Sequence, residues 1–149
     1  MNSIAQELQI DPAVFSGPAW VTLATLTVYY LFIVNVARVR IRLTHEYAAR
    51  GERFDRYFGQ DRQLLAADRI QLNMLEQMPV FLSLLWLHAF LVSAGEATIL
   101  GMIWVISRSL YPLVLGERMG RDIPLRILWV TFTGYAMLVA FGVRIIGNL

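Results

Sequence analysis

Three polar residues, Arg69, Asn73 and Glu76, stand four and then three positions apart in a segment that is otherwise mostly apolar. On a helix this spacing places their side chains on a single stripe. A guanidinium offers forked donors to carboxylates, a carboxylate offers a counter-charge to an ammonium group, and an amide both donates and accepts. The pattern therefore predicts a site for a small zwitterion with surplus carboxylates, such as a peptide-like ligand with two carboxylates and one amine.

The residues that follow extend this polar stripe and favour space beside it. Ser83 lies on the same stripe one or two turns farther along. Pro79 cannot donate a hydrogen bond to the carbonyl of Leu75, so we expect it to bend the helix. The chain has no cysteine, so any thiol used here must arrive on a ligand. A nearby arginine would favour the thiolate form of such a ligand by charge and hydrogen bonding.

Arginines also stand near the same end of the other apolar segments. The third segment carries Arg108 and then Tyr111-Pro112, and the fourth carries Arg126 in its first turn. These arginines, with Arg38 and Arg42, could instead anchor helix ends at the membrane surface, with Glu76 paired to Arg69 or Arg108. We favour anchoring for Arg38, Arg42, Arg118 and Arg121. Binding is favoured for Arg69, Asn73 and Glu76, because anchoring requires neither the amide nor the carboxylate.

The elements that position these residues follow from composition. The 149 residues are 57% hydrophobic and 16% charged, and the mean hydropathy is +0.53, which is typical of a membrane protein. All thirteen basic residues are arginine, and eleven acids leave a net charge of +2, so a nucleic-acid-binding face is not expected. The only histidines are His45 and His88, so no metal site is expected, and His88 is interpreted as a packed residue.

Four apolar segments predict an all-α fold, a single-domain integral-membrane four-helix bundle over residues 1–149. They cover about 17–37, 69–93, 97–115 and 124–146, close to the roughly 20 residues that cross a bilayer. The charged loop 38–68 is interpreted as a solvated extension or an interfacial helix, with admission of an anionic ligand as the alternative.

Arginine in the loops predicts the orientation of the chain, because short cytoplasmic loops carry the positive excess. Eight arginines against five acids stand from Arg38 to Arg69, and Arg118 and Arg121 follow the third segment. Glu7 and Glu96 stand at the opposite side with no arginine beside them in the sequence. The first and third loops are therefore expected to be cytoplasmic and both termini non-cytoplasmic. The first segment lacks the features of a signal peptide and is expected to be a retained helix.

The run Arg69-Ile-Gln-Leu-Asn73-Met-Leu-Glu76-Gln-Met-Pro79 resembles the signature of the MAPEG family, the membrane-associated proteins in eicosanoid and glutathione metabolism. Arg108-Ser-Leu-Tyr111-Pro112 extends the likeness. The resemblance implies four-helix subunits in a homotrimer, with glutathione held between neighbouring subunits near the cytoplasmic face. It also implies a glutathione-dependent transferase, peroxidase or isomerase acting on lipophilic electrophiles in the membrane.

The resemblance further implies roles for individual residues. Glutathione's polar groups would be held by Arg69, Asn73 and Glu76. Arg108 and Tyr111 would face them from the next subunit. A glutathione carboxylate would be bound by Arg40 or by Arg38. The thiolate would be stabilised by Arg126, with Arg121 as the alternative.

Two positions depart from the family pattern. Leu115 replaces a second tyrosine one turn after Tyr111, and Gln77 replaces the tyrosine that often follows the glutamate. They motivate a second hypothesis, a non-catalytic membrane bundle that serves as a scaffold or lipid-binding subunit. A third hypothesis is the use of another low-molecular-weight thiol. Polar residues on all four segments are hard to bury in one thin bundle, which favours a site between subunits.

Overall fold

The computed structural model describes residues 11–120 and 125–149, and these ranges contain helices and no strands. A short 3-10 helix η1 (Pro12–Phe15) leads into α1 (Ser16–Ala49), which is followed by α2 (Arg62–Leu91), α3 (Ala94–Leu115) and α4 (Arg126–Ile146). All four α-helices are long and apolar enough to cross a membrane. The predicted all-α, four-helix membrane fold is thus confirmed.

Two helices are longer than the apolar segments that predicted them. α1 continues to Ala49, past the expected end near residue 37, and α2 begins at Arg62 and not near 69. Hydropathy detects only the part of a helix that suits hydrocarbon, whereas polar turns continue a helix equally well. The Arg42–Glu46 ion pair of 3.6 Å, four residues apart, supports such a turn. Helical extensions therefore flank the first loop, while residues 50–61 between them contain no helix.

Local sequence signals mark the helix ends. Asp61 caps α2, because its carboxylate accepts from the amides of Gln63 and Leu64 at 2.8 and 3.3 Å. Ser93 caps α3 in the same way through the amide of Glu96. α3 ends at Leu115, and the following Gly116 has a φ of 84°, in the left-handed region that glycine adopts freely. α4 begins at Arg126, and the expected start at 124 lies outside the described residues.

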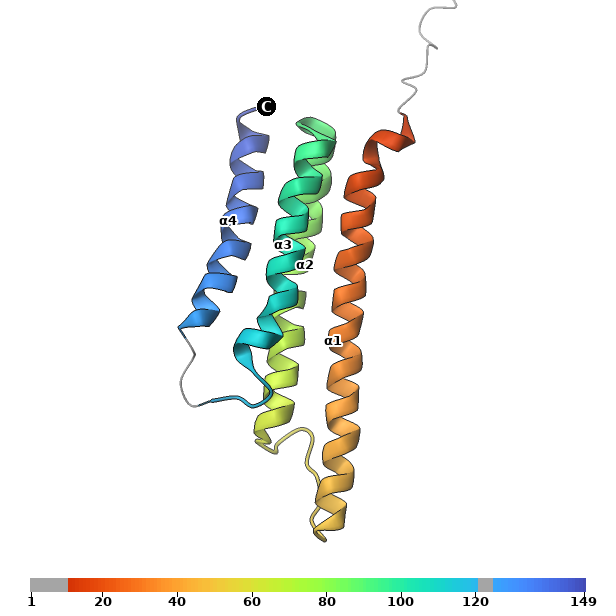
Figure 1. Ribbon diagram of the computed structural model, residues 1–149, viewed down its shortest axis with the longest axis vertical. Helices are drawn as coiled ribbons and strands as arrows, with labels where there is room; N and C mark the ends of the chain where they lie inside the picture. Colours follow the sequence, from red (N-terminus) through yellow and green to blue (C-terminus); the bar gives the residue numbers. More distant parts are fainter. Residues whose placement is uncertain (1–10, 121–124) are drawn as a thin grey trace, which may run out of the picture.

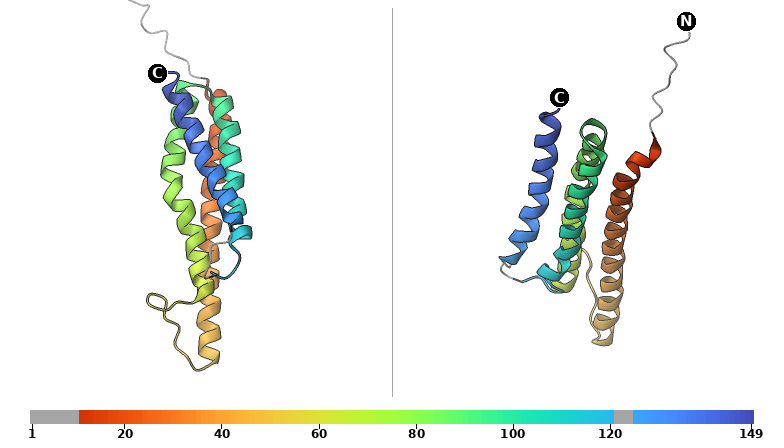
Figure 2. Two further views of the ribbon diagram at one scale, coloured as in Figure 1. Left: turned by 90° about the vertical axis from the view of Figure 1, so that its left-hand side faces the viewer. Right: turned by 45° about the horizontal axis from the view of Figure 1, so that its top comes forward.

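The helices stand side by side with α2 and α3 in the middle, flanked by α1 on one side and α4 on the other (Figure 1, Figure 2). The apolar windows of α2 and α3 are each 33% buried, against 11% for α1 and 17% for α4. At the lower end of Figure 1, α1 projects past the other helices. The helices α1 and α4 consequently lie on opposite flanks of the α2–α3 pair.

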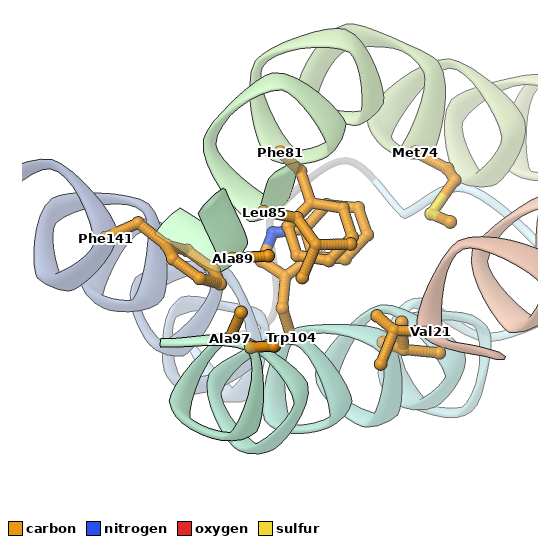
Figure 3. Close-up of a cluster of buried hydrophobic side chains, with 10 residues drawn as sticks. Val21, Met74, Phe81, Leu85, Ala89, Ala97, Trp104 and Phe141 are labelled. Atoms are coloured by element: carbon orange, nitrogen blue, oxygen red, sulfur yellow. The ribbon is translucent and has the colours of Figure 1, made fainter. Parts of the chain in front are cut away.

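The core is built from aromatic contacts between the middle helices. Phe81 of α2 stacks on Trp104 of α3 with ring centroids 3.8 Å apart, and Phe141 of α4 meets Phe81 edge-on at 6.2 Å (Figure 3). Val21 brings α1 against the same cluster. Such packing joins all four helices. α2 remains helical through Pro79, so the predicted bend does not interrupt the helix.

The end of the bundle away from the arginine-rich loops is held by an ionic cluster. Arg144 of α4 donates two hydrogen bonds to the carboxylate of Glu96 on α3, at 2.8 and 2.9 Å. His88 of α2 is fully buried, as expected for a packed residue, and its Nε2 lies 3.8 Å from the same carboxylate. Glu96 thereby links the ends of α3 and α4, and the buried His88 ring of α2 lies beside this pair without a hydrogen bond to any described residue.

Candidate functional site

The outward side of α2 carries two opposite charges, which we call the Arg69–Glu76 face. The two residues are seven positions apart, or about two helical turns, so they lie on the same side. Arg69 Nη1 lies 3.5 Å from Glu76 Oε1, and the side chains are 45% and 56% exposed. The anchoring alternative expected Glu76 to pair with Arg69 or Arg108, and the pair with Arg69 is present, but it is long and open. Both groups keep most of their hydrogen-bonding capacity for a ligand or a neighbouring subunit.

Arg108 lies inside the bundle, where it is 1% exposed. Its Nη1 donates to Asn73 Oδ1 at 2.8 Å, and its Nη2 donates to the carbonyl oxygens of Val130 and Thr131 at 2.9 and 3.3 Å. No carboxylate pairs with Arg108 within the described ranges. Neutral oxygens from α2 and α4 solvate this charge instead. Arg108 therefore bridges three helices of one subunit.

A glycine creates the space for that bridge. Gly134 of α4 faces the guanidinium of Arg108, and a Cβ added at this position would overlap it. Any side chain at 134 would thus displace Arg108 or α4. Sequence reasoning missed Gly134, although a glycine in the middle of a predicted membrane helix is the kind of signal that marks a close approach.

Asn73 accepts a hydrogen bond from the buried arginine and belongs to the same helix as the Arg69–Glu76 face. It is 6% exposed and lies on the same stripe of α2 as Arg69 and Glu76. Because arginine has only donors, the atom that faces Arg108 must be the amide oxygen of Asn73. The amide nitrogen is left as a donor with a fixed orientation.

Tyr111 packs in a second core cluster and is 4% exposed. Its neighbours there are Ala66, Ile70, Leu115 and Ile127. The ring is therefore held within its own subunit. Like Leu115, Gln77 departs from the family pattern and is buried. Neither the nitrogen nor the oxygen of its side-chain amide has a hydrogen-bond partner in the described part of the chain.

The comparison with known protein families gives a match to the MAPEG family model over residues 18–147. The chain belongs to the MAPEG family. It is also similar to an uncharacterized protein of Synechocystis sp., at 32% identity over 96 residues. That match covers 63% of this chain and 63% of the Synechocystis protein. The family match and the four membrane-crossing helices together identify an integral membrane protein.

The remaining expected site residues of this MAPEG chain lie on the two outer helices. Arg40 of α1 is half-buried and lines a hollow of about 260 Å³ together with Arg56 and Gln71. Arg38 is exposed on the same helix. Arg56 and Gln71 were not singled out from the sequence, because only the fold brings the first loop and α2 beside Arg40.

Arg126 is exposed at the first position of α4, and no ion pair engages it in the described residues. Arg121 falls in 121–124, outside the described residues. One MAPEG subunit thus brings Arg69 beside Glu76 and Asn73 beside Arg108. Arg40 belongs to α1 and Arg126 to α4, and these helices flank the α2–α3 pair on opposite sides, so the whole set does not converge within a single chain.

Proposed function

We propose that this MAPEG protein is a membrane-bound glutathione-dependent transferase or peroxidase that conjugates or reduces lipophilic electrophiles. The Arg69–Glu76 face carries this proposal. Ionisable side chains in membrane helices are costly unless they face a partner, a cavity or a substrate. An outward pair of opposite charges, each half exposed, suits the zwitterionic and carboxylate groups of glutathione. Arg69 would bind a carboxylate, Glu76 the ammonium group, and Asn73 would donate from its amide nitrogen.

The site is proposed to form between subunits of a homotrimer. Arg40 and Arg126 lie on helices at opposite flanks of one chain, so both can reach a ligand on the Arg69–Glu76 face only if a neighbouring copy contributes at least one of them. A neighbour would also cover charges that hydrocarbon solvates poorly. The buried positions of Arg108 and Tyr111 favour a supporting role within the subunit, in which Arg108 orients Asn73, over direct contact with a ligand from the next subunit.

Arg126 is proposed to stabilise the glutathione thiolate. In conjugation, the thiolate attacks an electrophilic carbon, and the leaving group departs with the bonding electron pair. In peroxide reduction, the thiolate attacks one oxygen, the O–O bond breaks, and the departing alkoxide takes a proton. The resulting glutathione sulfenic acid then reacts with a second glutathione to give the disulfide and water. The lipophilic substrate would enter laterally from the membrane.

A non-catalytic bundle is the second candidate, and two observations favour it. Leu115 and Gln77 stand where relatives are expected to carry tyrosines, and both side chains point into the subunit. Leu115 completes the apolar cluster around Tyr111 without a hydroxyl group. A scaffold or lipid-binding subunit would retain the fold with these residues and lose the chemistry.

Glutathione binding separates the two candidates. Calorimetric titration of the protein in nanodiscs should show saturable binding that Glu76→Gln weakens at least tenfold. Arg53→Gln, an exposed loop substitution that removes one charge, serves as the control. No binding by the wild type would exclude the glutathione-dependent enzyme. Parallel titrations with other low-molecular-weight thiols then test whether a different thiol is the ligand.

Turnover tests the proposed role of Arg126. Purified protein is assayed with glutathione and either a generic aryl halide or a lipid hydroperoxide. Arg126→Ala should lower kcat by about 10²-fold, because an electrostatic donor to a developing or resident anion contributes on this scale. Equal rates for Arg126→Ala and wild type would remove the residue from the mechanism.

The proposed orientation places residues 38–68 and the link after α3 in the cytoplasm and both termini outside it. The absence of cysteine makes a direct test simple. Arg53→Cys and Gly95→Cys each supply one thiol for a membrane-impermeant maleimide. Labelling of Gly95→Cys but not Arg53→Cys in intact cells supports the orientation, and the reverse result contradicts it.

A further inference from the structure

A polar hollow of about 360 Å³ lies at the arginine-rich end of the subunit, apart from the Arg69–Glu76 face. The end of α1, the start of α2 and the link after α3 meet there, and its charged and aromatic lining consists of Glu46, Tyr47, Arg50, Asp61, Arg62 and Arg118. Neither Arg69 nor Glu76 takes part. Three guanidinium groups in one hollow raise the question of what balances their charge.

The two carboxylates of this hollow are already engaged. Asp61 accepts the α2 amides through Oδ1 and the hydroxyl of Tyr47 through Oδ2, at 3.1 Å. Glu46 lies 3.6 Å from Arg42, which is not part of the lining. Arg50 pairs with Glu52 at 3.3 Å, outside the lining.

Arg62 and Arg118 remain without a carboxylate in the part of the chain that is described. Arg62 Nε donates to the carbonyl oxygen of Met119, and the amide of Met119 donates back to the carbonyl oxygen of Arg62 at 2.9 Å. These two hydrogen bonds hold Met119 against the start of α2. They leave both terminal nitrogens of Arg62 as donors and fix the backbone next to Arg118. The hollow is thus organised before any ligand binds.

We propose that this hollow binds a phosphate group between Arg62 and Arg118. A phosphate monoester carries about −1.5 to −2 charges at neutral pH, which balances two guanidiniums, whereas one carboxylate supplies a single charge. Forked guanidinium donors match the oxygens of phosphate. The side-chain amides of Gln60 and Gln63 offer further donors within the lining, whereas the Tyr47 hydroxyl is already used by Asp61. The phosphate belongs to a soluble monoester or to an anionic phospholipid headgroup.

The soluble source is tested with the full chain in phospholipid-free detergent, titrated calorimetrically with phenyl phosphate and with phenylacetate. Wild-type protein should bind phenyl phosphate at least tenfold more tightly than phenylacetate. The headgroup source is tested in phosphatidylcholine nanodiscs with and without phosphatidic acid, by counting retained phosphatidic acid molecules with native mass spectrometry. Binding in either arm supports the site and identifies the source.

Arg118→Gln is the decisive variant, because no hydrogen bond or ion pair in the described residues uses its guanidinium and its removal breaks no such contact. It should weaken phosphate binding at least tenfold, and Arg62→Gln should do the same. Arg53→Gln is the matched control and should bind like wild type. Equal binding by Arg118→Gln and Arg53→Gln would overturn the proposal, as would equal affinity for the carboxylate or no binding in either arm.

Discussion

At the scale of single residues, Arg108 is a charge held inside an apolar bundle by oxygens that carry no net charge. Asn73 and two carbonyl oxygens of α4 receive its donors, and Trp104 lies 5.8 Å from its guanidinium carbon. A buried charge that loses a partner is expensive, because no water replaces it. The stability of the bundle should therefore depend on the partners of Arg108 as well as on Arg108 itself.

Gly134 and Gly142 provide a matched pair on α4. A Cβ at Gly134 would overlap the guanidinium of Arg108, whereas a Cβ at Gly142 meets nothing within 4 Å. Gly134→Ala should destabilise the protein by about 1–3 kcal/mol, the usual range for overpacking. Gly142→Ala should be neutral or stabilise the helix by up to about 1 kcal/mol. Thermal unfolding in detergent measures both, and equal midpoints would contradict the packing of Arg108 against α4.

The hydrogen bond between Asn73 and Arg108 can be tested by replacing the amide with an apolar group or with a carboxylate. Asn73→Leu leaves a donor of Arg108 unpaired and should cost about 1–3 kcal/mol of stability. Asn73→Asp keeps an acceptor for Arg108 and should unfold close to wild type, but it loses the amide donor and should weaken glutathione binding. A wild-type midpoint for Asn73→Leu would show that the hydrogen bond contributes nothing.

At the scale of elements, the buried and the exposed sides of α2 carry different polar residues. Asn73, Gln77 and Phe81 point into the bundle, whereas Arg69 and Glu76 point out of it. The stripe of polar residues was predictable from spacing alone. Its division between a buried amide and exposed charges was not, because that depends on where α3 and α4 pack. Periodicity fixes which residues share a side of a helix, but not which neighbour covers them.

The loop between α1 and α2 contains a turn that should respond to pH. Asp55 accepts from the amides of Phe58 and Tyr57, at 3.0 and 2.9 Å, and these backbone hydrogen bonds hold the pKa of its carboxyl below the ordinary value. A lowered pKa means that the folded turn favours the ionised form. Its stabilisation is present above pH of about 4 and is lost as the pH falls through the folded-state value.

Hydrogen exchange at Tyr57 and Phe58 measures this turn. Protection of the two amides should fall on acidification below pH of about 4, after correction for the intrinsic exchange rate. Asp55→Asn should show weaker protection at neutral pH and little dependence on acidification. An unchanged pH profile in that variant would assign the protection to something other than the carboxylate.

At the scale of the whole molecule, the arrangement of the helices decides how a complete site can form. α1 and α4 flank the α2–α3 pair, so Arg40 and Arg126 of one chain belong to helices on opposite sides (Figure 1). The membrane fold was predictable from hydropathy, and the polar stripe of α2 was predictable from residue spacing. The hydrogen bonds between Arg62 and Met119 and the contact of Gly134 with Arg108 were not predictable, because each joins segments far apart in sequence.

A trimeric assembly with shared sites predicts complementation between inactive subunits. Glu76→Gln and Arg126→Ala each disable a different half of the proposed site. In randomly mixed trimers, about a quarter of sites between neighbours combine the two intact halves, so activity should return to about that fraction of wild type. Native mass spectrometry of the same samples should give three subunits. No recovery in mixed trimers would place both residues in one subunit, and a monomeric mass would contradict the assembly.

The bridge made by Arg108 also constrains how the protein is made. On its own, a membrane helix with an embedded arginine inserts at a cost of up to about 2.5 to 3.5 kcal/mol, the value for the helix centre. Asn73 is synthesised before Arg108, in a helix that only a two-residue turn, Val92 and Ser93, separates from α3. The two carbonyl oxygens come afterwards, with α4. We therefore expect α2 and α3 to leave the translocon as a hairpin that already shields the arginine, and α4 to lock it as the last helix to arrive.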